Sequence, residues 1–235
     1  MNRLASRRSL IAVSFSLFII LGVSTGVTGV VWPSLRSDFS RPLADLGVLL
    51  AVGTGGYFLA GLTAGWLTRR LGIGRVLIVV LALGSGCLGG YVLVQSWLLL
   101  LACSVGVGFA GGTIDSLMNA YVALRHDTRM MNLLHAFFGI GATTAPLLVT
   151  VVLSGGLSWK VSYLVVVAAE LALLVAVIRM RSRWPDSAAL VLPGEGHHRL
   201  GGSVIGLLGM FFLYVGIEIT AGQWSFSVLT EGRRI

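Results

Sequence analysis

Apolar stretches long enough to cross a lipid bilayer occupy most of this chain of 235 residues. A helix needs about 20 mainly apolar residues to span the hydrocarbon core. Seven segments meet that length, and they run over residues 9–33, 44–68, 75–96, 98–123, 131–153, 161–180 and 202–226. The sequence therefore predicts an all-α, polytopic membrane protein.

The composition excludes an ordinary soluble domain. Hydrophobic residues make up 56% of the chain, charged residues only 11%, and the mean hydropathy is +0.91. Such a chain has too little charge to cover a water-exposed surface, so the lipid bilayer is its expected partner. Although the formal net charge is +8, the basic residues form short clusters between apolar segments, which does not indicate a nucleic-acid partner. Cys87 and Cys103 lie inside apolar segments without metal-site spacing, so we expect no disulfide, metal or other cofactor.

The basic residues divide unequally between alternate loops. One set of loops holds Arg3, Arg7, Arg8, Arg69, Arg70, Arg75, Arg125, Arg129, Arg179, Arg181, Arg183 and Arg199, and the other set holds Arg36, Arg41, Lys160, Arg233 and Arg234. Cytoplasmic loops carry an excess of Lys and Arg. We therefore predict a multi-pass protein of the plasma membrane whose N-terminus is cytoplasmic.

Residues 181–200 form the one long polar connector of the sequence, and they are rich in Pro, Gly and His. This composition is typical of a flexible linker. We therefore predict three parts: a six-helix bundle over residues 1–180, a cytoplasmic linker over residues 181–200, and a seventh helix within residues 201–235.

Small residues recur four positions apart in most of the apolar segments. The pairs are Gly22 and Gly26, Gly61 and Gly65, Gly86 and Gly90, Gly108 and Gly112, and Gly202 and Gly206. Within lipid such pairs let helix backbones approach closely, so we interpret them as packing faces. Pro146 removes one backbone hydrogen bond inside the fifth segment and should kink that helix.

The loop between the second and third segments, GWLTRRLGIGRVL over residues 65–77, is short, basic and bracketed by glycines. It resembles the signature loop of the major facilitator superfamily. The positions that match the family pattern are Gly65, Leu67, Arg70 and Gly72. Arg69 stands where the family has an aspartate, and Arg75 adds a further basic side chain.

Two further stretches, GFAGGTIDSLMNAYVA and RMMNLLHAFFGIGATTAPLL, resemble the fucose:proton symporter branch of that superfamily. Members of this branch carry an acid and an asparagine one turn apart in the fourth helix, which are Asp115 and Asn119 here. The resemblance implies that Asp115 takes part in proton coupling and sugar binding. The acid that sugar-transporting members place late in the first helix corresponds to Gly29, and amides of their fifth helix correspond to His135 and Phe138. Fucose itself is therefore not the expected solute.

The architecture of that family consists of two six-helix halves, and this chain has the length of about one half. The resemblance therefore implies a first half of six helices, the central linker, and the opening helix of a second, truncated half. A missing second half, or a second copy of this chain, is the further partner that the resemblance implies.

Asp115 is an acid inside the fourth apolar segment, where an unpaired charge costs roughly 2.5–3.5 kcal/mol on insertion scales. Spacings of three and four place it on one helix face with several small residues and with Asn119. We interpret this face as the wall of a central cavity, and a structural aspartate bonded to a neighbouring helix is the alternative. His135 lies at a similar depth in the fifth segment, where it either relays a proton to Asp115 or makes a contact between helices.

The seventh segment contains a second candidate group, Glu218, Gln223 and Trp224. Amides and aromatic rings suit a sugar, because the hydroxyl groups of the sugar form hydrogen bonds and its apolar face stacks on an indole. The alternative for Trp224 is an ordinary aromatic residue of the membrane interface. Glu170 in the sixth segment has no polar companion on its own helix face, and we assign it no role.

Together these residues predict a carrier, and not an enzyme, that couples protons to the movement of a small polar solute such as a sugar by alternating access. A drug or metabolite efflux carrier of the same superfamily and a non-transporting fragment are the alternatives. A retinal protein is excluded because Lys160, the only lysine, lies in a loop. An intramembrane protease is not indicated, since the sequence has no HExxH motif, no GxSG motif and no second aspartate at a matching depth.

Overall fold

A computed structural model describes the backbone of residues 3–185 and 202–229, together with most of the side chains in those ranges. The helices in chain order are α1 (Arg3–Asp38), α2 (Asp45–Leu71), α3 (Ile73–Leu93), α4 (Trp97–Arg125), α5 (Thr128–Ser154), α6 (Lys160–Met180), the short 3-10 helix η1 (Arg181–Arg183) and α7 (Gly202–Ser227). Each predicted apolar segment is a helix, and the described ranges contain no strand, so the all-α class is confirmed. Within these ranges, the six helices α1 to α6 are long and apolar enough to span a membrane.

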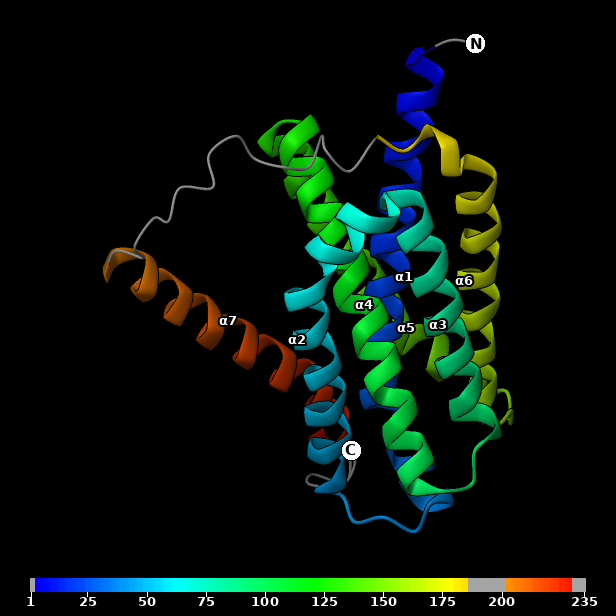
Figure 1. The fold of residues 1–235 in the computed structure, drawn as a ribbon. Coiled ribbons are helices and arrows are strands. Elements are labelled where there is room, and N and C mark those ends of the chain that lie inside the picture. Colours follow the sequence, from blue (N-terminus) through cyan, green and yellow to red (C-terminus); the bar gives the residue numbers. More distant parts are fainter. Residues whose placement is uncertain (1–2, 186–201, 230–235) are drawn as a thin grey trace.

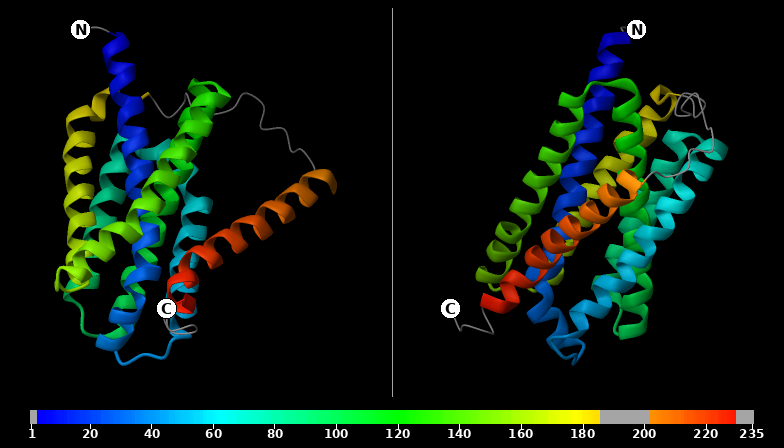
Figure 2. Two further views of the ribbon diagram at one scale, coloured as in Figure 1. Left: turned by 180° about the vertical axis from the view of Figure 1, so that it is seen from behind. Right: turned by 90° about the vertical axis from the view of Figure 1, so that its left-hand side faces the viewer.

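Short connections fold α1 to α6 into a bundle in which successive helices run up and down (Figure 1). Gly72 alone separates α2 from α3. Its φ of 80° is a left-handed conformation that glycine adopts without strain, and its N–H donates to the carbonyl of Thr68 at the end of α2. The alternation brings the start of α1, the α2–α3 and α4–α5 connections and η1 to one end of the bundle, here called the arginine-rich end (Figures 1 and 2).

Glycines bring pairs of helices into backbone contact. A Cβ atom at Gly22 of α1 would lie 2.1 Å from the carbonyl oxygen of Phe138 in α5. A Cβ atom at Gly108 of α4 would lie 1.9 Å from the carbonyl oxygen of Gly53 in α2. Because no real Cβ atom approaches an oxygen so closely, only glycine allows α1 to pack on α5, and α2 on α4, at this separation.

The packing interpretation of the glycine pairs is confirmed in part. Gly26 lies against α5 and Gly112 lies against α2, as the spacing predicts. The interpretation is wrong for Gly61, Gly86 and Gly206, where an added Cβ atom would meet no described atom within 4 Å. Sequence spacing finds small faces on a helix, but it does not say which of them a neighbouring helix covers.

The buried apolar side chains form two cores along the bundle. One core gathers residues of α1, α3 and α4 near the arginine-rich end and includes Trp184. The other lies toward the opposite end around Trp32, which is completely buried. Two tryptophan indoles hold the connections at this end. Trp32 Nε1 donates to the carbonyl of Leu43, in the α1–α2 connection, over 3.1 Å. Trp159 Nε1, in the α5–α6 connection, donates to the Asp38 carboxylate over 2.9 Å.

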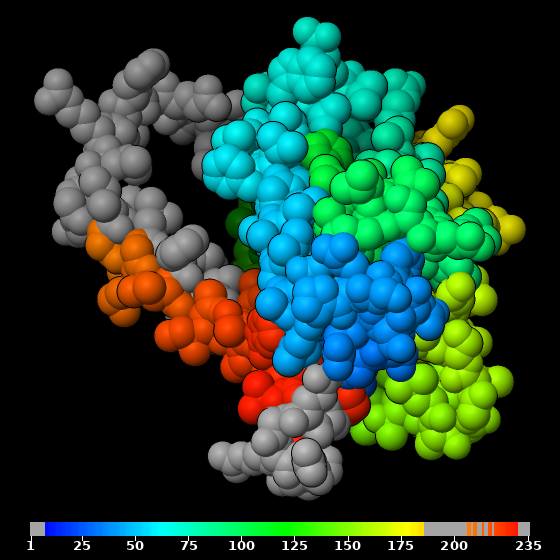
Figure 3. All heavy atoms as spheres, turned by 90° about the horizontal axis from the view of Figure 1, so that it is seen from below, coloured from blue at the N-terminus to red at the C-terminus, as the bar shows by residue number. Residues whose placement is uncertain are grey.

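Two elements differ from what the sequence indicates. Helix α1 begins at Arg3 and continues through Pro33 to Asp38, so it is longer than the apolar run of residues 9–33. Helix α7 leans away from the bundle at its start, and only its C-terminal part approaches α1 and the beginning of α2 (Figures 2 and 3). The predicted linker includes η1, but residues 186–201 lie outside the described part of the chain, so the division into three parts stays a prediction.

Candidate functional site

Asp115 of α4 has its carboxylate hydrogen-bonded to two side chains. Tyr57 of α2 donates its hydroxyl to Oδ2 over 2.7 Å, and Asn119 donates Nδ2 to Oδ1 over 3.0 Å. Asn119 lies one turn after Asp115, so the predicted spacing of acid and amide on one face produces a direct contact. Hydrogen bonds to an ionised carboxylate are among the stronger ones, and here they satisfy a charge that lipid does not solvate.

His135 of α5 lies close enough to Asp115 for an electrostatic interaction. Its ring meets Phe18 of α1 edge to face, with the ring centroids 5.7 Å apart. The His135 side chain is exposed, whereas the side chains of Asp115 and Asn119 are half-buried. Three helices therefore bring Tyr57, Asp115, Asn119 and His135 together, and we refer to these four residues as the Asp115 cluster.

The small residues that precede Asp115 on its face of α4 pack against α2. Cβ atoms at Gly108 and Gly112 would collide with the backbone oxygens of Gly53 and Tyr57. The expectation that this stripe forms a cavity wall is therefore wrong for these two glycines, because the neighbouring backbone fills the space. On this face of α4, the accessible part is the stretch after Gly112, where Asp115 and Asn119 lie half-buried.

Gln223 and Trp224 lie at the contact between α7 and the bundle. Gln223 is 4% exposed and donates Nε2 to the carbonyl of Thr25 in α1 over 2.7 Å. The absence of a side chain at Gly29 makes this contact possible, since a Cβ atom there would lie 2.5 Å from the backbone oxygen of Gln223. Trp224 is half-buried at the edge of the second core. Gln223 therefore joins α7 to α1, and Trp224 lies near Gly47 of α2. The side chain of the third candidate, Glu218, lies outside the described part of the structure.

Glu170 of α6 has a partner that its own helix face does not reveal. Ser85 of α3 donates its hydroxyl to Oε2 over 3.0 Å, and the Glu170 side chain is only 8% exposed. Gly84 lies beside the carboxyl group, since a Cβ atom there would be in van der Waals contact with Oε2 at 3.5 Å. Sequence reasoning assigned no role to Glu170 because its partner comes from another helix.

Tyr57 is the one residue of the Asp115 cluster that sequence reasoning missed. It follows the glycine-rich run GTGG of α2, and it is the sole tyrosine of that helix. A polar aromatic residue within an apolar, glycine-rich span is a signal that points to an intramembrane hydrogen bond. The spacing within one helix could not show that its hydroxyl reaches α4.

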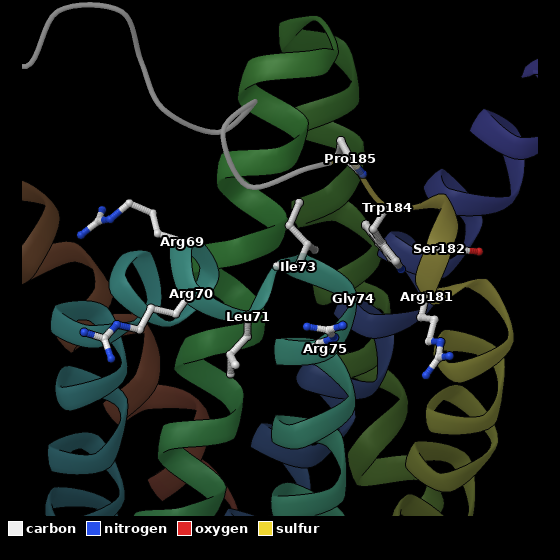
Figure 4. A pocket seen from close by; sticks show the side chains of 11 residues that line it. Arg69, Arg70, Leu71, Ile73, Gly74, Arg75, Arg181, Ser182, Trp184 and Pro185 are labelled. Atoms are coloured by element: carbon white, nitrogen blue, oxygen red, sulfur yellow. The ribbon is translucent and has the colours of Figure 1, made fainter.

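The signature-loop residues Gly65, Arg69, Arg70, Gly72 and Arg75 end α2 and begin α3 at the arginine-rich end (Figure 4). All three arginines are exposed, and the Arg70 guanidinium lies over the Trp66 ring, 4.5 Å from its centroid. Gly72 is the residue that reverses the chain. The loop is therefore a tight, basic turn well separated along the bundle from the hydrogen bonds of Gln223 and Trp159.

The chemistry open to the Asp115 cluster is proton binding and hydrogen bonding. A carboxyl, a phenol, an amide and an imidazole supply acceptors and donors, and the carboxyl and the imidazole are groups that can bind a proton. Among the described residues, no group of three or more His, Cys, Asp or Glu side chains is placed to hold a metal ion.

Comparison with known proteins gives two findings. A family model described as Major Facilitator Superfamily matches residues 13–230. A protein named Bypass of stop codon protein 6, from Saccharomyces cerevisiae (strain ATCC 204508 / S288c), is 21% identical over 248 aligned residues, which cover 92% of this chain and 49% of the relative. The chain therefore spans about half the length of the curated relative that it matches.

Proposed function

Because the chain belongs to the major facilitator superfamily, we propose that it forms the proton-binding half of a carrier that moves a small polar solute, such as a sugar, across a membrane. The proposed mechanism is alternating access, in which one helical bundle rocks against another around a site near the middle of the membrane. A second half, supplied by another chain or by a second copy, completes the carrier in this proposal.

The proposal depends on the hydrogen bonds of the Asp115 carboxylate, which accepts from Tyr57 of α2 and from Asn119 of α4. When Asp115 is ionised, both donors point to its oxygens. Protonation removes the negative charge and weakens both hydrogen bonds, because a neutral carboxyl is a poorer acceptor. The Tyr57 hydroxyl and the Asn119 amide are then available to hydroxyl groups of a solute, so proton binding and solute binding share the same donors.

His135 supports a path for the proton in this proposal. Its imidazole is exposed and within electrostatic reach of Asp115, and an imidazole gains and loses protons near neutral pH. We propose that His135 passes protons between water and Asp115. A purely structural histidine would be expected to have its ring buried between helices, whereas the His135 side chain is exposed and meets Phe18 edge to face.

The experiment is pH-driven uptake into proteoliposomes that contain the protein, with a panel of labelled monosaccharides, polyols and amino acids. The change Asp115→Asn keeps an amide oxygen for Tyr57 but removes the exchangeable proton. We expect it to abolish uptake driven by acid outside while the variant still inserts into the membrane. Glu170→Gln is the matched control, because it alters another intramembrane acid that lies away from the cluster and is expected to retain uptake.

Acid-driven uptake that persists in Asp115→Asn would contradict proton coupling through this residue. Exchange of labelled solute across the membrane without a pH gradient requires solute binding but not proton coupling. We expect Asp115→Asn to retain this exchange for a solute that it still binds. Efflux of a preloaded solute against external acid would favour the antiport of a drug or metabolite, which is the alternative carrier.

A further inference from the structure

An open pocket of about 470 Å³ lies at the arginine-rich end, between the α2–α3 connection and the segment that follows α6 (Figure 4). Its charged and polar side chains are Arg69, Arg70, Arg75, Arg181, Ser182 and Trp184. In Figure 4, the side chains of Arg75 and Arg181 lie below Gly74, while those of Arg69 and Arg70 project from the end of α2 away from Gly74. Among the described residues that line the pocket there is no carboxylate, so the pocket is strongly positive.

The first turn of α3 adds backbone donors to the same pocket. Val76 is the first residue of α3 whose N–H reaches a helical carbonyl, that of Gly72, over 3.1 Å. The N–H groups of the three preceding residues belong to the helix start, which carries a partial positive charge. A Cβ atom at Gly74 would lie 2.7 Å from the backbone oxygen of Arg181, so the glycine lets the end of α6 pack directly on this turn.

Trp184 closes the inner side of the pocket. Its side chain is 7% exposed, and its Nε1 is buried without a hydrogen-bond partner. The adjacent ring atom, Cδ1, lies 3.2 Å from the Cβ position of Gly74, which places the indole N–H edge at the first turn of α3. An indole nitrogen only donates, and a buried donor without an acceptor costs about 1–3 kcal/mol.

Exposed apolar side chains run from this pocket along the bundle. On α3, Val79 and Leu83 follow Arg75 at intervals of four residues and are 56% and 38% exposed. On α6, the exposed side chains of Val175 and Ile178 precede Arg181. Because α3 and α6 pack against each other, both rows start beneath the same arginines.

We propose that this pocket binds the phosphate of an anionic phospholipid in the membrane leaflet at the arginine-rich end. The phosphate oxygens accept hydrogen bonds from Arg75 and Arg181. The acyl chains lie along the exposed apolar rows of α3 and α6. Basic pockets at the ends of membrane helices suit anionic headgroups, and a soluble anion would gain nothing from the two apolar rows.

The test measures lipid binding to the purified protein in detergent by native mass spectrometry, with phosphatidylglycerol and phosphatidylcholine of the same chain length. We expect phosphatidylglycerol to be retained selectively. The double change Arg75→Gln with Arg181→Gln should weaken its Kd about 30-fold, from the loss of two cations near the headgroup. Trp184→Phe keeps a ring against Tyr121 and should leave the Kd unchanged, because the Nε1 atom that it removes is buried away from the pocket surface.

The matched control is Arg125→Gln with Arg129→Gln, which removes two exposed arginines from the same end of the bundle outside the pocket. We expect this control to bind phosphatidylglycerol as the unchanged protein does. Equal loss in both double variants would show general charge attraction and overturn the site. Equal retention of both lipids, or displacement of phosphatidylglycerol by millimolar inorganic phosphate, would overturn the lipid assignment. Thermal unfolding of each variant, measured without lipid, separates lost binding from lost folding.

Discussion

Two carboxyl groups inside the same bundle have different surroundings. Asp115 is half-buried and accepts from a phenol and an amide, whereas Glu170 is 8% exposed and accepts from the single hydroxyl of Ser85. A group that binds and releases protons needs access to water and donors that respond to its charge. Asp115 meets that requirement, and Glu170 is placed as a structural link between α3 and α6.

The change Tyr57→Phe tests the donor that sequence reasoning missed. It keeps the ring and removes the hydroxyl that Asp115 accepts. A hydrogen bond to a charged group contributes about 1.5–3 kcal/mol, so we expect proton-driven uptake in proteoliposomes to fall at least about tenfold. Because the Tyr57 side chain is 42% exposed, the thermal unfolding midpoint should change little. Unchanged uptake would contradict a role for the Tyr57 hydrogen bond in proton-driven uptake.

The change Ser85→Ala tests the structural role of Glu170. It leaves a buried carboxyl without its donor, and we expect a loss of about 1–3 kcal/mol in the free energy of unfolding, measured in detergent. Combining it with Glu170→Leu removes both polar partners and should restore much of the loss, since a matched apolar pair leaves nothing unsatisfied. A single variant as stable as the parent would contradict this role.

At the scale of the helices, the sequence predicted every span and the shared face of Asp115 and Asn119, because both depend on local periodicity. It did not predict the contact of Tyr57 with Asp115 or of Ser85 with Glu170, because these join helices that are distant in sequence. The glycine stripe before Asp115 shows the same limit. Its small residues were recognisable, but whether they meet a cavity or the backbone of α2 depends on which helix is the neighbour.

The changes Gly108→Ala and Gly61→Ala test that distinction with the same added methyl group. At Gly108 the methyl would lie 1.9 Å from the backbone oxygen of Gly53, so α2 and α4 must separate. We expect a loss of about 1–3 kcal/mol in unfolding free energy, or failure to fold. At Gly61 no described atom lies within 4 Å, and alanine should be neutral or stabilise the helix by up to about 1 kcal/mol. Equal effects in detergent unfolding would contradict the packing of α2 on α4.

At the scale of the whole molecule, the fold places the arginine clusters of alternate loops at one end of the bundle. Residues 69–75 and 181–183 meet there, and the α4–α5 connection lies at the same end (Figures 1 and 4). By the positive-inside rule, we expect that end to be cytoplasmic. If so, the proposed lipid pocket faces the leaflet that carries most anionic lipids, and His135, which lies in the half of α5 nearer to this end, exchanges protons with the cytoplasm.

Cysteine labelling at two exposed serines tests this orientation. Ser182 lies at the arginine-rich end and Ser158 in the connection between α5 and α6 at the opposite end. In a background with Cys87→Ala and Cys103→Ala, a membrane-impermeant maleimide should label Ser158→Cys in intact cells. It should label Ser182→Cys only after the membrane is opened, because the excess of arginine around that site resists translocation. The reverse pattern would place the arginines outside, and the inner-leaflet location of the lipid pocket would then be wrong, although its binding of phosphatidylglycerol in detergent would still be measurable.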